Sequence, residues 1–158
     1  MKILIATDGS DFSRQAIEKV CEMLANGKNN SIEIISVAEE VANTGTEPFG
    51  ISADYIREME KNGHEQATKF ASEAEAVVRG QFADSSTAVT TKIIKGSAGR
   101  AIVEEAGNWG ADLIVVGSHG YGFWGRVFLG STADKVIHHA PCSVLIVRTK
   151  SDESSAND

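Results

Sequence analysis

The stretch Asp112-Leu113-Ile114-Val115-Val116-Gly117 is a short, almost wholly apolar run that ends at a glycine. Two further runs, residues 2–7 (KILIAT) and 143–148 (SVLIVR), have the same character. Continuous apolar runs of this length are typical of strands that are covered on both faces, as in a parallel sheet. Two weaker strands are expected over residues 31–38 and 88–95, and the mixed polarity of the second indicates a place nearer a sheet edge.

Apolar residues at helical spacing fill the gaps between these strands. They predict a first helix that Ser10 or Asp11 could cap. A long helix is expected over residues 52–81, with one apolar face that runs from Ile56 to Val77.

Two shorter helices complete the pattern. One is expected after Ser97, and the other is expected to begin with a Ser-x-x-Asp capping box at Ser131 and to run through His138 before Pro141 ends it. Strands and helices therefore alternate from end to end. Because crossovers between parallel strands are right-handed, this order predicts an α/β fold with a doubly wound, five-stranded parallel sheet and helices on both faces.

Length and composition indicate a single domain. The chain has 158 residues, of which 42% are hydrophobic and 23% charged, as in ordinary globular proteins. We expect one domain over residues 1–149 and a disordered polar tail over residues 150–158. Cys21 and Cys142 match neither metal-site nor redox-pair spacing, so both are expected to be small buried side chains.

The charge balance excludes several classes of function. A net charge of −7 is unsuited to a general nucleic-acid or membrane-surface binder, which needs clustered Lys and Arg. No apolar run is long enough to span a membrane, and the start of the chain lacks the apolar core of a signal peptide. We therefore expect a cytoplasmic protein.

The segment from Gly117 to Thr132 is rich in glycine and leads from a buried strand to a helix start. Such a loop can turn its backbone N–H groups toward an anion, and the helix start adds positive potential. A P-loop is rejected because Ser131 stands where its lysine would be, and a dinucleotide-binding Rossmann motif is rejected because its glycine spacing is missing from the first turn. A phosphate site and a simple surface loop remain as alternatives.

At this point a resemblance becomes specific. The pattern Gly117-x2-Gly120-x9-Gly130-Ser131, followed by residues 139–148 (HAPCSVLIVR), resembles the nucleotide-binding signature of the universal stress protein family. Residues 3–10 (ILIATDGS), 96–98 (GSA) and 111–117 (ADLIVVG) also fit that family. The resemblance implies the strand order 3-2-1-4-5, as in adenine-nucleotide-hydrolase-like folds.

The same resemblance implies an ATP site. Members that keep the glycine motif bind ATP, and by analogy the backbone amides of the loop and helix start hold the phosphates, which here means Gly120, Gly130, Ser131 and Thr132. Ala6, Thr7 and Asp8 are implied to lie against the adenosine, and the backbone of Val37 is implied to meet the adenine. Gly117, Ser118 and His119 of the same loop are also expected among the nucleotide-binding residues.

Three side chains have competing interpretations. Asp8 could cap the first helix or contact the nucleotide, and near phosphates it would need Mg²⁺ between the two negative groups. Arg126 could reach the phosphates or remain solvated. His119 is interpreted as a loop residue rather than a catalyst.

The leading hypothesis is a regulatory, stress-response module that binds ATP with Mg²⁺. One alternative is slow ATP hydrolysis or adenylyl transfer, with Asp8 as the candidate to hold a metal or water. Another is a partner-binding dimer that does not depend on nucleotide. A homodimer through the last strand, at Val144 and Ile146, is expected, and the resemblance favours it.

Overall fold

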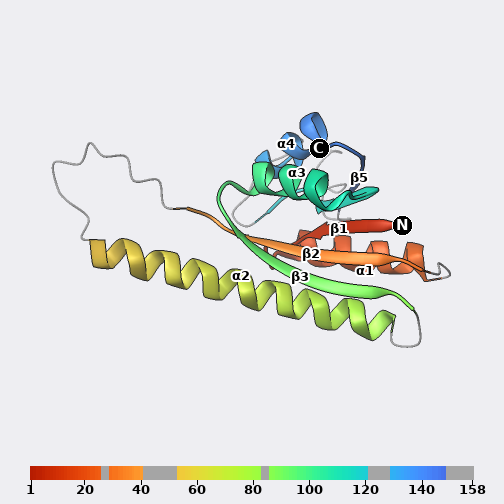
Figure 1. The fold of residues 1–158 in the computed structure, drawn as a ribbon, viewed down its shortest axis with the longest axis horizontal. Helices are drawn as coiled ribbons and strands as arrows, with labels where there is room; N and C mark the ends of the chain where they lie inside the picture. Colours follow the sequence, from red (N-terminus) through yellow and green to blue (C-terminus); the bar gives the residue numbers. More distant parts are fainter. Residues whose placement is uncertain (26–28, 41–52, 83–85, 121–128, 149–158) are drawn as a thin grey trace, which may run out of the picture.

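The computed structural model describes residues 1–25, 29–40, 53–82, 86–120 and 129–148. These residues form a five-stranded parallel sheet in the order β3-β2-β1-β4-β5, with helices on both faces (Figure 1). The strands are β1 (Lys2–Ala6), β2 (Ser31–Ala38), β3 (Ala88–Lys95), β4 (Leu113–Gly117) and β5 (Ser143–Val147). The helices are α1 (Asp11–Leu24), α2 (Ala53–Gln81), α3 (Ala98–Trp109) and α4 (Ser131–His139). The predicted fold class and strand order are confirmed.

The central strand β1 shows why continuous apolar runs mark this sheet. Ile3 and Ile5 pack into one core with residues of α1 and α2, whereas Leu4 packs into a second core with residues of α3 and α4. All three side chains are fully buried. Since successive side chains point to opposite faces, a strand covered on both sides must be apolar at every position.

The helix starts partly differ from the sequence interpretation. Ser10 caps α1, and its side chain accepts a hydrogen bond from the Ser13 amide, as predicted. The capping box at Ser131 is wrong: the N-cap of α4 is Gly130, without a side-chain cap, and the helix continues to His139. A glycine there leaves the first amides of the helix without a local side-chain acceptor.

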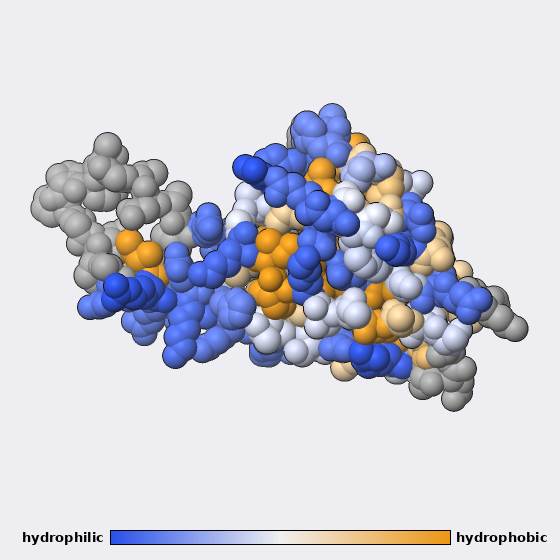
Figure 2. All heavy atoms as spheres, viewed as in Figure 1, coloured by the Kyte–Doolittle hydropathy of each residue, from blue (hydrophilic) through white to orange (hydrophobic). Residues whose placement is uncertain are grey.

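The long helix α2 is confirmed, but its predicted apolar face is only half right. From Ala67 onward it packs on the sheet, and the fully buried residue near its end is Val78 rather than Val77. Tyr55 and Met59 are exposed, because the first turns of α2 extend past the carboxyl ends of the strands (Figure 1). The surface of this projecting part is mostly hydrophilic (Figure 2).

The remaining expectations have mixed outcomes. The mixed strand 88–95 is β3 and lies at a sheet edge, as expected. Cys21 is buried, and desolvation raises the pKa of its thiol to about 11, whereas Cys142 is only half-buried. Within the described residues, no helix is long and apolar enough to cross a membrane. The tail at residues 150–158 lies outside the described part of the chain.

Candidate functional site

The connection pattern reverses between β1 and β4. From β1 the chain builds outward to β2 and β3 on one side, and it then returns to build β4 and β5 on the other. Parallel α/β sheets bind ligands beyond the carboxyl ends of their strands at such a switch point. A cleft of about 550 Å³ lies there, lined by residues of β1, β2 and β4 and of the helices α2, α3 and α4.

This cleft gathers most of the residues predicted for the site. The lining includes Ala6, Thr7, Asp8, Val37, Gly117, His119, Gly120, Gly130, Ser131 and Thr132. Ser118 is fully buried beside them. Arg126 lies outside the described residues, so its contact with phosphates stays a prediction.

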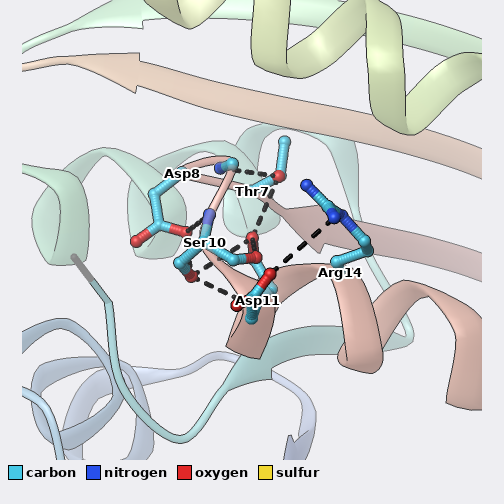
Figure 3. Close-up of polar contacts among 7 residues, drawn as sticks. Thr7, Asp8, Ser10, Asp11 and Arg14 are labelled. Atoms are coloured by element: carbon cyan, nitrogen blue, oxygen red, sulfur yellow. Dashed lines mark hydrogen bonds and ion pairs between the residues drawn. The ribbon is translucent and has the colours of Figure 1, made fainter.

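The turn after β1 is held by hydrogen bonds among short polar side chains (Figure 3). Asp8 Oδ1 accepts from the Ser10 amide at 3.0 Å and from the Ser10 hydroxyl at 2.6 Å. Thr7 Oγ1 accepts from the Gly9 amide at 3.2 Å and lies 3.2 Å from Ser13 Oγ. Ser10 is thus the cap of α1, and Asp8 orients that cap instead of serving as one.

The other oxygen of Asp8 is directed toward the glycine loop. A Cβ atom added to Gly120 would lie 2.6 Å from Asp8 Oδ2, and one added to Gly117 would lie 2.8 Å from the carbonyl carbon of Phe12. Glycine at Gly117 is explained by the close approach of the α1 backbone, whereas a side chain at Gly120 would force the Asp8 carboxylate to move. The Asp8 carboxylate and the loop backbone therefore face each other at the cleft.

The N-terminus of α4 provides the amides of the site. The Gly130 amide already donates to the Ser118 carbonyl at 2.9 Å, and the first intrahelical bond runs from the Asp134 amide to the Gly130 carbonyl. The amides of Ser131 and Thr132 lie between these two bonds, in the turn whose N–H groups have no intrahelical acceptor. They are the better candidates for an anion, and direct donation by Gly130 is disfavoured in this arrangement.

The loop between Gly117 and Gly120 is packed more tightly than its polarity suggests. His119 is 8% exposed, its Nδ1 lies 3.1 Å from Ser118 Oγ, and its ring centroid lies 5.2 Å from that of Phe12. The Ser118 amide donates to the Val147 carbonyl at 2.9 Å. These contacts fix the loop against α1 and β5, which agrees with a structural role for His119.

Val37 presents its backbone to the cleft. The last hydrogen bond from β1 to this edge of β2 joins the Thr7 amide to the Ile35 carbonyl, at 2.9 Å. Peptide groups on a parallel strand alternate between its two neighbours. The amide and carbonyl of Val37, two residues further on, therefore point past the end of β1.

Sequence reasoning missed the wall that α2 contributes. Gly63, Gln66, Ala67 and Phe70 line the cleft, as does Ser36 from β2. Their spacing along α2 was a visible signal, but it is also the spacing of a core-facing helix. Only the projection of α2 past the sheet shows that this face borders a cleft.

A smaller hollow of about 350 Å³ adjoins the cleft along α3 and α4. It shares Glu39, Ala98, Ser131 and Thr132 with the cleft, and its other lining includes Lys135 and His138. With both signs of charge and no glycine loop, it suits a phosphate chain less well. Among the described residues, no group of three or more His, Cys, Asp or Glu side chains is placed to hold a metal ion.

Comparison with known proteins identifies the family. Residues 1–148 match the sequence profile of the Universal stress protein family. This chain belongs to the universal stress protein family. It is 36% identical over 151 residues to universal stress protein A homolog 2 of Coxiella burnetii, covering 94% of this chain and 95% of the relative. A universal stress protein of Thermus aquaticus is 34% identical over 146 residues, covering 92% of this chain and 97% of the relative.

Solved structures of universal stress proteins share the fold. The Arabidopsis thaliana protein with AMP bound has a TM-score of 0.68 at 18% identity and covers 99% of this chain and 97% of its own. A universal stress protein in complex with cAMP has a TM-score of 0.62 at 22% identity, with coverages of 95% and 98%. The Archaeoglobus fulgidus protein in complex with dAMP has a TM-score of 0.58 at 18% identity, with coverages of 92% and 96%.

Proposed function

We propose that this chain binds ATP in the cleft at the β1–β4 switch point and acts as a nucleotide-dependent regulatory module in a cytoplasmic stress response. The observation that carries the proposal is the convergence of three elements on one cleft: the Thr7–Asp8 turn, the Val37 peptide and the glycine-lined start of α4. Family members crystallised with AMP, cAMP and dAMP support an adenine nucleotide as the ligand.

The phosphates fit the glycine side of the cleft. The amides of Gly120, Ser131 and Thr132 are the proposed donors, and the positive end of the α4 dipole favours negative charge at this place. Gly130 contributes by letting the backbone approach, since a Cβ atom there would lie 3.2 Å from His119 Cα. Ala6, Thr7 and the Val37 peptide are left for the adenosine.

A divalent cation fits between the phosphates and Asp8. Asp8 Oδ2 faces the glycine loop, and a carboxylate oxygen is a ligand that Mg²⁺ prefers. Mg²⁺ usually takes only one or two protein carboxylates and completes its shell with water and phosphate oxygens, so a single aspartate suffices. Bound there, Mg²⁺ would neutralise the repulsion between Asp8 and the phosphates.

Titration calorimetry with ATP and Mg²⁺ tests this function. The variant carries Gly120→Val and Gly130→Val, and the matched control carries Gly80→Val and Gly107→Val, two helical glycines whose added Cβ atoms meet nothing within 4 Å. We expect saturable binding by the wild type and the control, and loss of binding in the loop variant with its circular dichroism retained. Parallel titrations with AMP and cAMP, with and without Mg²⁺, rank the ligands.

The outcome also separates the alternatives. Absence of heat up to millimolar ATP, a free energy weaker than about −4 kcal/mol, contradicts the proposal and favours nucleotide-independent partner binding. Release of ADP in proportion to intact protein, lost in Asp8→Asn, favours slow hydrolysis over a purely regulatory role.

We also propose that two copies pair through β5. Within the described residues β4 is the only strand that pairs with β5, so the other side of β5 is an open sheet edge bordered by the half-buried Val144 and Ile146. Light scattering at micromolar concentration is expected to give a dimer, which Ile146→Lys converts to a monomer. Ile94→Lys is the matched control, because Ile94 is a half-buried isoleucine packed against the same core at the opposite sheet edge. A monomeric wild type contradicts this proposal.

A further inference from the structure

Two buried carboxyl groups lie between the sheet and α3, on the side of the sheet opposite α2 (Figure 1). Glu33 of β2 is 8% exposed, Glu105 of α3 is 6% exposed, and the two side chains lie within hydrogen-bonding reach of each other. Lys92 of β3 donates to Glu105 Oε2 at 2.7 Å. Glu33 Oε1 has no hydrogen-bond partner among the residues that the structure describes. The lysine therefore serves Glu105, and Glu33 is left beside a second carboxyl group.

One shared proton accounts for this carboxyl pair, Glu33 and Glu105. Two carboxylates in contact repel each other, so such a pair retains a proton and titrates as a unit. Burial and then the charge of Glu105 raise the pKa of Glu33, and the charges of Lys92 and Lys2 oppose that rise only in part. Among the described residues, these three are the charged groups that face Glu33, from α3, β3 and β1. Glu33 is thus the member of the pair that carries the proton.

The carboxyl pair shares its layer of the fold with one wall of the cleft. Side chains at every second position of a strand share a face, so Glu33 lies on the α3 side of β2 together with Val37. On α3, Ala98, Ile102 and Glu105 follow one another at helical spacing along one face. Val37, Ala98 and Ile102 line the cleft. The carboxyl pair and the cleft wall are therefore two parts of one contact between β2 and α3.

The joints at the two ends of α3 have open space around them. Gly96 precedes the helix with φ of 137°, and Gly110 follows it with φ of 71°. A Cβ atom added to either glycine would meet nothing within 4 Å. The N-cap Ser97 makes no side-chain hydrogen bond to the helix. The position of α3 over the sheet is therefore set by packing along its length, and the carboxyl pair is part of that packing.

We propose that the carboxyl pair is a proton-dependent contact that holds α3 against β2 and thereby controls nucleotide affinity in the cleft. This inference rests on the proposed ATP site and assigns its regulation. With the proton shared, Glu33 donates to Glu105 and the cleft wall of Ala98 and Ile102 stays in place. When the proton leaves, two buried carboxylates face each other beside one paired lysine. Their repulsion moves α3, and the cleft wall with it, away from β2.

The sign of the pH effect follows from this arrangement. The protonated pair favours the closed wall, so ATP affinity should be full at acidic pH, below the pKa of the pair in the free protein. Coupling between two sites is reciprocal, so bound ATP should raise the pKa of the pair. Affinity should therefore fall as pH rises between these two pKa values, and ATP binding within that range should draw a proton onto the pair.

Proton uptake is measured by titration calorimetry with ATP and Mg²⁺ in two buffers of different ionisation enthalpy, at several pH values. ATP itself exchanges protons, so the wild type is compared with Glu33→Gln, which has the shape of a protonated glutamate and does not titrate. We expect the wild type to take up more protons than Glu33→Gln. Its affinity should also fall about fivefold more with rising pH, which is the lower end of typical couplings.

Glu104→Gln is the matched control for this comparison. Glu104 is the neighbouring carboxylate on α3, but it is exposed and pairs with Arg100 at 2.7 Å. This variant removes the same charge from the same helix without touching the carboxyl pair. Its proton uptake and its pH profile should therefore equal those of the wild type.

A second variant moves the transition instead of removing it. The charge of Lys92 lowers the pKa of Glu33, so Lys92→Met should raise the pKa of the pair. The fall in ATP affinity should then shift to higher pH. An ion pair with a purely structural role predicts a uniform loss of affinity and an unshifted profile. Circular dichroism at each pH verifies that both variants are folded.

These outcomes separate the regulation from the site that it controls. If the wild type binds ATP with the proton uptake and pH profile of Glu33→Gln, or if Lys92→Met leaves the profile unshifted, the inference is overturned and the ATP site stands. If the wild type binds no ATP at any pH, the proposed function is overturned, and the inference with it.

Discussion

Replacement of Gly9 by alanine should be far more costly than the same change at Gly110. Both glycines adopt nearly the same left-handed backbone, with φ of 73° at Gly9 and 71° at Gly110. A Cβ atom on Gly110 meets nothing within 4 Å, whereas one on Gly9 would lie 2.2 Å from a ring carbon of Phe70. Gly110→Ala is therefore a control for backbone strain without a clash.

The two costs can be estimated separately. Alanine in the left-handed backbone region destabilises the folded state by about 1–2 kcal/mol. Alanine also lowers the conformational entropy of the unfolded chain, which offsets about 0.4–1 kcal/mol of that loss. Gly110→Ala should thus lower the free energy of unfolding by about 1 kcal/mol. Gly9→Ala adds about 1–3 kcal/mol of overpacking against the Phe70 ring, which gives about 2–4 kcal/mol in all.

Urea unfolding followed by circular dichroism measures both values by linear extrapolation. In a Phe70→Leu background the cost of Gly9→Ala should fall toward that of Gly110→Ala, because the ring that it strikes is gone. Equal destabilisation by the two alanine variants, or no coupling between Gly9 and Phe70, would refute the reasoning. Since Phe70 lines the cleft, a ring displaced by Gly9→Ala should also weaken nucleotide binding.

Three further predictions concern polar groups. Ser10→Ala removes the α1 cap and should lower the free energy of unfolding by about 1–2 kcal/mol in urea, whereas an unchanged value would mean that the Ser13 amide finds another acceptor. Burial, and then the nearby charge of Glu105, raise the pKa of Glu33, so its contribution to stability is full at acidic pH and is lost as pH rises through that raised pKa. Glu33→Gln should flatten this part of the stability–pH profile, and an identical profile would argue against the assignment. Lys92→Ala leaves the buried Glu105 carboxylate without its 2.7 Å ion pair. The midpoint of thermal unfolding should therefore fall, by about 2–4 °C for each kcal/mol of stability lost. An unshifted midpoint would mean that solvent replaces the lysine.

The sequence alone was sufficient to predict where the strands lie and that they form a parallel sheet covered on both faces. The runs at 2–7, 112–117 and 143–148 are apolar throughout, and only burial on both faces accounts for such a pattern. Their observed ends differ from the expected ones by a single residue. At one of these ends Asp112 lies outside β4, and its carboxylate accepts from the Lys2 amide at 2.7 Å.

Helix starts were less predictable, because capping depends on one dihedral angle and one hydrogen bond. The motif at Ser131 fits a capping box, yet Gly130 occupies the N-cap position. Ser131 therefore begins the helix itself, and the amides at this end remain available to a ligand. The sequence had instead suggested that the Ser131 hydroxyl would accept a hydrogen bond from one of these amides as the helix cap.

Local sequence determined which segments are strands and helices, and the glycine motif together with the family resemblance pointed to the residues that now line one cleft. Only the tertiary structure decided that α2 extends past the sheet and makes Gly63 and Gln66 part of the wall. Periodicity shows which residues share a helix face, but it does not show how far the sheet beneath that face extends. Residues of α2 that face the core and residues that face the cleft recur at the same spacing along the helix. Only the length of the neighbouring strands shows which of them lie beyond the sheet.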